Sequence, residues 1–162
     1  MTANGQSVSQ RPIAPIKRRI LLVDDDPAVL LTLKAVLEMS GFEIETASSS
    51  AAAFDRITSN TYHMVITDAR MESETSGREV IRAAQKQPYA PATALFTAYP
   101  PANGDWHGAQ TLLVKPVGTE DMLRQIEALL IRHEDEKQLR RTALHVVGGQ
   151  TAIRGERRRK VS

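Results

Sequence analysis

The stretch "RRILLVDDDPAVL", residues 18–30, joins an apolar run to three consecutive carboxylates. A continuous apolar run of this length is typical of a strand in a parallel sheet that is covered on both faces. Asp26 precedes Pro27, and this pair is typical of a helix N-cap and the first helical position. Either Asp24 or Asp25 alone could be a turn acid at a strand end, but side by side they repel. The sequence therefore predicts a positively charged partner that offsets the repulsion between the two carboxylates.

The rest of the chain alternates strand and helix signals. Apolar or alternating runs predict five strands, and amphipathic stretches with capping residues predict four helices between and after them. The pattern predicts an α/β fold with a doubly wound, five-stranded parallel sheet. The expected strands are 19–23, 42–47, 63–68, 92–98 and 111–114, and the expected helices are 26–41, 48–60, 76–87 and 119–141.

The composition of the 162 residues excludes several classes of protein. The chain has no cysteine, so disulfides and thiolate metal sites are not available. It has no run of eighteen apolar residues, and its N-terminus lacks the apolar middle of a signal peptide. A cytoplasmic protein without a membrane segment is the expectation.

Charge is segregated along the chain. Residues 1–19 carry a formal charge of +4 and residues 139–162 carry +6, which leaves −8 for the part between them because the total is +2. This pattern predicts a flexible N-terminal segment over 1–17 and a globular domain over 18–135. Residues 136–162 are expected to form a helical extension and then a basic, disordered tail.

Five polar side chains lie at or directly after the ends of predicted strands. They are Asp24 and Asp25 after the first strand, Asp68 after the third, Thr97 at the end of the fourth and Lys115 after the fifth. In an open parallel sheet, ligands bind beyond the carboxyl ends of the strands. Three carboxylates can share such a place if a hard divalent cation neutralises them, and oxygen ligands suit Mg²⁺. With an ammonium and a hydroxyl added, these groups can hold a phosphoryl group during in-line transfer.

Four short motifs follow one another along the chain in the order that is typical of one protein family. The segments "LLVDDDP" (21–27), "MVITDARM" (64–71), "LFTA" (95–98) and "VKP" (114–116) resemble the receiver domain of two-component response regulators. The resemblance covers about residues 18–132. It implies a flavodoxin-like sheet and a signalling protein that is not itself an enzyme.

The resemblance also implies a role for each acidic residue. Asp68 would be the phosphoacceptor and would take its phosphoryl group from the phosphohistidine of a sensor histidine kinase or a phosphotransfer protein. Asp24 and Asp25 would be the acidic pair, with Asp25 the more direct Mg²⁺ ligand. The backbone carbonyl of Arg70 would complete the metal site.

Two further motif residues would bind the phosphoryl oxygens. They are Thr97 and Lys115, and Pro116 would be the proline that follows the lysine in a cis linkage. Phosphorylation would then switch a surface that a downstream protein reads. The sequence does not identify that downstream protein.

The chain departs from the family pattern at three places. Glu72 stands where the family has a proline, and Leu112 stands where it has an aromatic residue. The segment between Thr97 and Lys115 is about one helical turn short. It contains "YPPANGDWHG" (99–108), whose prolines and glycines oppose a helix. The helix that the family has here is therefore expected to be reduced or absent.

Two other functions remain open from the sequence. A haloacid-dehalogenase-like phosphatase would use Asp24 and Asp26, but it needs a further acidic motif, and only Glu120 and Asp121 follow Lys115 closely. A receiver-like scaffold with a vestigial site would act through its basic tail. The tail has no aromatic residue between its arginines, so nucleic acid is not favoured as its partner.

Overall fold

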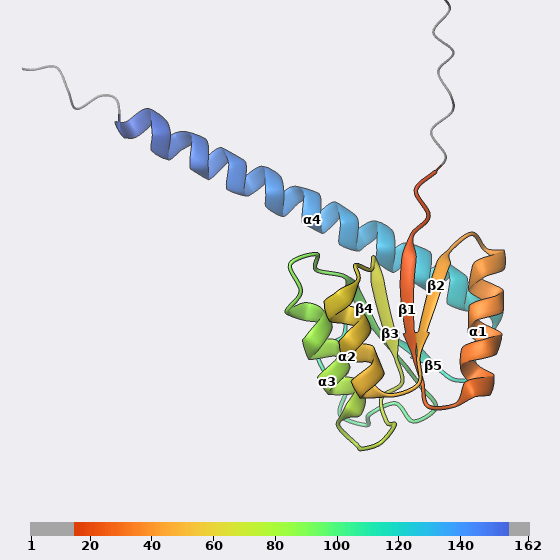
Figure 1. The fold of residues 1–162 in the computed structure, drawn as a ribbon. Coiled ribbons are helices and arrows are strands. Elements are labelled where there is room, and N and C mark those ends of the chain that lie inside the picture. Colours follow the sequence, from red (N-terminus) through yellow and green to blue (C-terminus); the bar gives the residue numbers. More distant parts are fainter. Residues whose placement is uncertain (1–14, 156–162) are drawn as a thin grey trace, which may run out of the picture.

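The computed structural model describes residues 15–155, with side chains as far as Val147. Five parallel strands form one sheet in the order β2-β1-β3-β4-β5, which confirms the predicted doubly wound α/β fold (Figure 1). Most of the predicted N-terminal segment (1–14) and the end of the basic tail (156–162) lie outside the described residues. The strands are β1 (Arg19–Val23), β2 (Glu43–Ala47), β3 (Met64–Thr67), β4 (Ala92–Thr97) and β5 (Thr111–Val114), and the helices are α1 (Pro27–Met39), α2 (Ser50–Ser59), α3 (Ser76–Gln85) and α4 (Thr119–Gly155).

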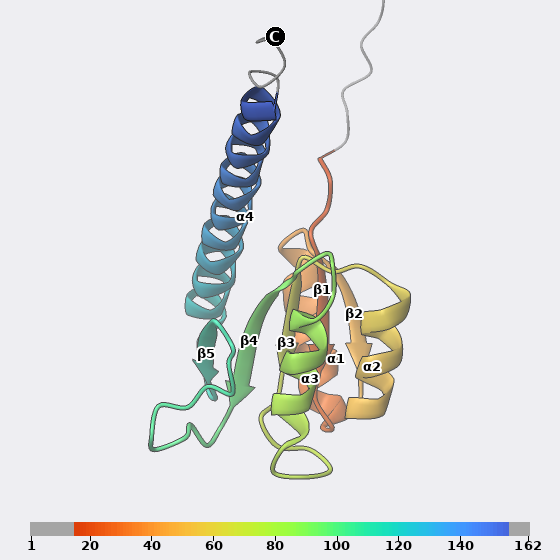
Figure 2. The same cartoon turned by 90° about the vertical axis from the view of Figure 1, so that its left-hand side faces the viewer.

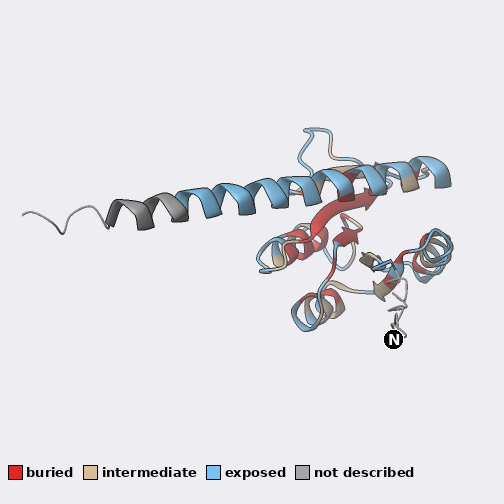
Figure 3. Ribbon diagram, turned by 90° about the horizontal axis from the view of Figure 1, so that it is seen from above, coloured by how far each residue is buried: buried red, intermediate tan, exposed pale blue. Residues whose placement is uncertain are grey.

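Side chains of β1 alternate between the two faces of the sheet. Ile20 and Leu22 join a core cluster with residues of α1 and α4, such as Leu37 and Ile126. Leu21 and Val23 join a second cluster on the opposite face, where α2 and α3 pack. Both faces are therefore buried, which explains why the strand is apolar from Ile20 to Val23. Figure 3 shows the buried residues concentrated in the sheet and on the inner sides of the helices.

The ends of α1 are fixed by local chemistry. The Asp26 side chain accepts a hydrogen bond from the backbone N–H of Ala28, and Pro27 occupies the first turn, as predicted. Gly41 follows the last turn with a φ of +91°, a conformation that favours glycine. Asp26 is therefore a helix cap and not a member of the acidic pair.

The connection between β4 and β5 contains no helix in the described chain. Residues 98–110 form turns and irregular backbone, as the prolines and glycines predict. Figure 2 shows this connection as an open loop beside the sheet. Arg78 of α3 holds it, with its guanidinium donating to Asp105 at 2.9 Å and to Nδ1 of His107 at 3.1 Å.

Helix α4 is longer than the sequence pattern predicts. It runs for 37 residues to Gly155, whereas the sequence pattern predicts a helix that ends at residue 141 and a disordered tail after the helical extension. Its first turns pack on the sheet through buried residues such as Met122 and Leu129. The later part projects past the beginnings of the strands (Figures 1 and 2). Residues 142–147 of this extension are exposed, so packing on the sheet does not account for it.

No helix within the described residues is both long and apolar enough to cross a membrane.

Candidate functional site

Three carboxylates meet at the carboxyl ends of β1 and β3. Oxygen atoms of Asp24, Asp25 and Asp68 lie within 4.8 Å of one another. β1 and β3 are neighbours in register, with Val23 beside Thr67, so the residues that follow them emerge together. Asp24 is buried, Asp68 is half-buried and Asp25 is exposed. The three carboxylates therefore span the range from buried to exposed at this edge of the sheet.

Lys115 supplies the positive charge of the site. Its Nζ lies 2.7 Å from a carboxylate oxygen of Asp24 and 3.7 Å from one of Asp68. The same ammonium lies 4.8 Å from the centroid of the Phe96 ring, close enough for a cation–π contact. Pro116 follows in a cis peptide bond, as the resemblance implies. The lysine thus links the end of β5 to the acids of β1 and β3.

Asp68 is held in a partly desolvated environment. Burial raises the pKa of its carboxyl group. The charge of Lys115 and the backbone N–H groups of Ala69 and Arg70 lower this pKa, whereas the charge of Asp24 raises it, and the net direction is upward. Asp68 is therefore a carboxylate whose charge is incompletely compensated by the protein alone. A cation or a developing positive centre beside it would relieve that cost.

Gly77 allows α3 to approach the backbone of Asp68. A Cβ atom at residue 77 would lie 2.4 Å from the carbonyl oxygen of Asp68 and 2.7 Å from Cα of Ala69, too close for any side chain. The N–H of Gly77 donates to the carbonyl of Ala69 at 3.2 Å. The glycine therefore fixes the position of the segment that carries Asp68.

Thr97 lies at the end of β4 and is buried. Its hydroxyl oxygen accepts a hydrogen bond from the backbone N–H of Tyr99 at 3.2 Å, and its carbonyl accepts one from the N–H of Lys115. The first of these bonds connects the hydroxyl to the beginning of the 98–110 loop. The side chain of Arg70 forms an exposed ion pair with Glu74 at 3.5 Å.

Glu72 binds the beginning of α2. Its carboxylate accepts hydrogen bonds from the backbone N–H of Ser50 at 2.8 Å and from the Ser50 hydroxyl at 3.2 Å. An acidic side chain is favourable at a helix N-terminus because unpaired N–H groups converge there. The residue at the family's proline position therefore ties the segment after Asp68 to α2.

Sequence patterns identified the residues at the strand ends but missed those that position them. Phe96, Gly77 and the Glu72–Ser50 contact all depend on segments that are distant in the sequence. The one available signal was Gly77, which stands at the start of a predicted helix where glycine is unfavourable. The haloacid-dehalogenase interpretation loses its basis, because Asp26 caps α1.

Comparison with protein families identifies the class. Residues 20–127 match the model of the response regulator receiver domain. The match covers most of the chain and all of the site residues named above, so the chain belongs to this family of phosphorylation-dependent signalling domains. Receiver domains are typically signalling modules rather than classical enzymes.

Individual relatives agree with this assignment. Response regulator MprA of Mycobacterium sp. strain KMS is 34% identical over 118 residues, which are 70% of this chain and 51% of the relative. ArlR of Staphylococcus saprophyticus is 27% identical over 124 residues, 75% of this chain and 56% of the relative. The chain thus spans about half the length of these curated relatives.

Solved structures show the same fold. A CheY-like receiver domain protein from Methanospirillum hungatei superposes with a TM-score of 0.68 at 27% identity, covering 74% of this chain and 98% of that chain. TrrA of Thermotoga maritima, solved in complex with Mg²⁺-BeF, superposes with a TM-score of 0.63 at 30% identity. This match covers 69% of this chain and 98% of that chain.

Proposed function

We propose that the chain accepts a phosphoryl group on Asp68 in a Mg²⁺-dependent reaction, with a histidine kinase or a phosphotransfer protein as donor. The observation that carries this proposal is the position of Lys115, whose ammonium lies within 4 Å of both Asp24 and Asp68. The positive charge of Lys115, close to both Asp24 and Asp68, would stabilise the negative charge of a phosphoryl group bound at Asp68.

The residues present fit a magnesium ion. The cluster offers carboxylate oxygens only, and Mg²⁺ prefers oxygen ligands with few protein contacts. Asp25 and Asp68 would hold the ion, Asp24 would support it from the buried side, and the Arg70 carbonyl would add a fourth protein oxygen. When bound, Mg²⁺ would neutralise the carboxylates and the transferred phosphoryl oxygens.

The chain's own groups would then carry out the transfer. A carboxylate oxygen of Asp68 attacks the phosphorus, so an O–P bond forms while the bond from phosphorus to the donor breaks and its electron pair leaves with the donor. Lys115 and Thr97 donate hydrogen bonds to the phosphoryl oxygens. Since the Thr97 hydroxyl also accepts from Tyr99, this contact would alter the 98–110 loop, which a downstream protein would read.

Incubation of the full chain with acetyl phosphate tests the proposal. Intact mass spectrometry should show one added phosphoryl group in the presence of Mg²⁺ and none with EDTA. Asp68→Asn should remove the modification, whereas Asp55→Asn, an exposed position on α2, should leave it unchanged. No labelling of the parent chain with Mg²⁺ present would favour the alternative, a receiver-like scaffold that acts through its basic tail.

A further inference from the structure

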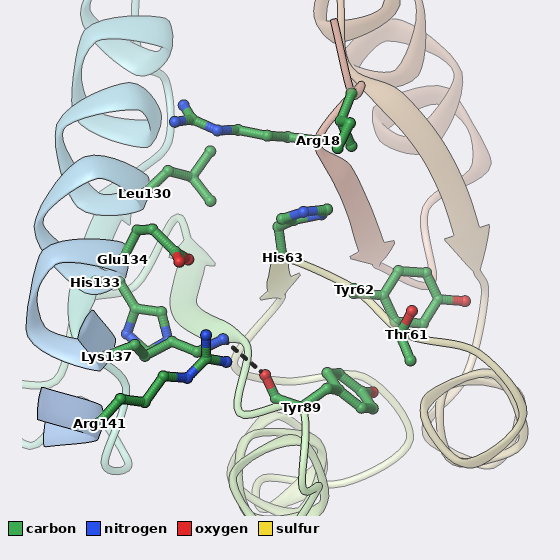
Figure 4. Close-up of a pocket in the computed structure, with 11 residues that line it drawn as sticks. Arg18, Thr61, Tyr62, His63, Tyr89, Leu130, His133, Glu134, Lys137 and Arg141 are labelled. Carbon is green, nitrogen blue, oxygen red and sulfur yellow. Dashed lines mark hydrogen bonds between the residues drawn. The ribbon is translucent and has the colours of Figure 1, made fainter. Parts of the chain in front are cut away.

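A cavity of about 440 Å³ lies at the opposite end of the sheet from the carboxylates. It opens where the strands begin, between the middle of α4 and the residues that precede β1 and β3 (Figure 4). Sites for small organic molecules have volumes of roughly 300–1,000 Å³. The projecting part of α4 forms one wall, so the cavity exists because this helix continues beyond the sheet.

Three cationic side chains line this cavity. Figure 4 shows Arg18 reaching from the start of β1 toward α4, and Lys137 and Arg141 reaching back from α4. Lys137 and Arg141 are one helical turn apart and share a face. Within residues 15–147, none of the three has a carboxylate at ion-pair distance. Glu134 is the one acidic residue among the lining residues, so the lining carries a formal charge of +2.

Hydrogen bonds hold the α4 wall in place. His133 Nε2 bonds to the carbonyl of Ala90 at 2.8 Å, and its Nδ1 lies 2.9 Å from Nε2 of Gln110. Lys137 Nζ donates to the carbonyl of Tyr89 at 2.9 Å. The helix is therefore fixed against the segment before β4 at two successive turns. Because this wall is already ordered before a ligand binds, binding costs less conformational entropy.

His63 adds a polar group to the opposite wall. Its Nδ1 accepts a hydrogen bond from the backbone N–H of Arg19 at 3.0 Å, so in the neutral ring the proton is on Nε2. Burial lowers the pKa of His63, and the charge of Arg18 lowers it further. Lys137 and Arg19 act in the same direction, and only Glu134 opposes them. The ring therefore lies in a positive electrostatic potential.

We propose that this cavity binds a small organic molecule that carries a phosphate group. The phosphate would lie among Arg18, Lys137 and Arg141, because guanidinium groups bind phosphate oxygens in pairs and the net formal charge of +2 in the lining matches a dianion. The organic part would contact the apolar side chains of Leu130 and Ile16. The site is separate from the one that contains Asp68, so this proposal does not depend on the phosphoacceptor function.

Titration of the full chain with phenyl phosphate in EDTA tests the proposal by NMR. Omission of Mg²⁺ prevents binding at the acidic cluster. Resonances of His63 and His133 should shift in a saturable way, and the pKa of His63 should rise because a bound anion cancels part of the positive potential. Inorganic phosphate should bind more weakly than phenyl phosphate, and phenol should not shift these resonances. Equal binding of inorganic and phenyl phosphate would overturn the organic part of the proposal.

A pair of matched variants separates a built site from general charge attraction. Arg18→Gln with Arg141→Gln removes two lining cations, whereas Arg82→Gln with Arg132→Gln removes two exposed cations that do not line the cavity. The first variant should bind phenyl phosphate at least about tenfold more weakly, since each charged hydrogen bond contributes on the order of a tenfold change. The second should bind as the parent does. Equal weakening by both variants, or no saturable shift in the parent, would overturn the proposal.

Discussion

The Nζ atom of Lys115 lies 2.7 Å from a carboxylate oxygen of Asp24, although the two residues are 91 positions apart in the chain. Asp24 is only 3% exposed, so this ion pair is largely removed from water. A buried charge that loses its partner is costly, whereas the intact pair contributes little net stability. Lys115 therefore has a structural role in the resting protein besides the role we propose for it in phosphoryl binding.

Lys115→Met should destabilise the metal-free protein by about 3 kcal/mol, because it leaves the buried Asp24 without a cation. Urea unfolding in EDTA at neutral pH measures this change in the free energy of unfolding. Added Mg²⁺ should restore part of the loss, since the ion replaces the missing positive charge. A variant with parental stability in EDTA would contradict the importance of the ion pair.

Asp68→Asn should stabilise the metal-free protein at neutral pH. The pKa of Asp68 is raised in the folded state, so between its ordinary value and the raised value the folded protein binds more protons than the unfolded chain. Stability therefore falls as the pH rises through this window, and the carboxylate is a net cost above it. The asparagine removes that cost, so the difference from the parent should be largest at neutral pH and shrink in acid. Thermal unfolding in EDTA across this pH range checks the sign, and a stability difference that grows toward acid pH would contradict it.

Gly77→Ala should destabilise the fold by more than about 2 kcal/mol, because its Cβ would overlap the backbone of Asp68 and force α3 or the loop to shift. Gly118→Ala is a matched control, since the nearest atom to a Cβ there is 3.9 Å away. Urea unfolding of both variants gives the comparison. The Gly77 variant should also accept phosphoryl groups more slowly, because Asp68 would move. Similar stability for the two variants would show that the contact at Gly77 relaxes without cost.

The 98–110 loop should report phosphorylation. Its first hydrogen bond is from Tyr99 to the hydroxyl of Thr97, and Leu112 has no ring that could rotate in response to a change at Thr97. Backbone amide resonances of residues 98–108 should therefore shift more on phosphorylation than those of β5. A response confined to residues 111–114 and α4 would contradict this route.

Arg78 should determine how firmly this loop is held in the resting state. Arg78→Gln removes the contacts to Asp105 and His107, so limited proteolysis between residues 98 and 108 should become faster. Arg82→Gln, an exposed arginine on the same helix, is the control and should leave the rate unchanged.

The sequence predicted the sheet and the polar residues at the carboxyl ends of its strands, because both follow from local patterns. The run Ile20–Val23 is apolar at every position because both faces of the strand are covered. Polar residues directly after such a run lie at the carboxyl edge of the sheet. The absence of a helix between β4 and β5 was predictable for a similar reason, since Pro100, Pro101 and Gly104 oppose helical backbone.

The remaining features depend on packing between distant segments, which no local pattern encodes. The requirement for glycine at residue 77 arises from a contact with Asp68 nine residues earlier, and Glu72 meets Ser50 across 22 positions. His63 and His133 lie 70 positions apart in the sequence, yet both line one cavity. The α4 residues that line the cavity lie within the predicted helix, but their position beside the segments before β1 and β3 is not encoded by any local pattern.

Mapping of the phosphorylated residue tests the central claim most directly. After incubation with acetyl phosphate and Mg²⁺, borohydride reduction converts an acyl phosphate of aspartate to homoserine, and peptide mass spectrometry then locates it. We predict homoserine at Asp68 alone, with none at the neighbouring Asp24 or Asp25. Homoserine at either of those residues instead, or at no aspartate of the chain, would contradict the assignment of Asp68 as the phosphoacceptor.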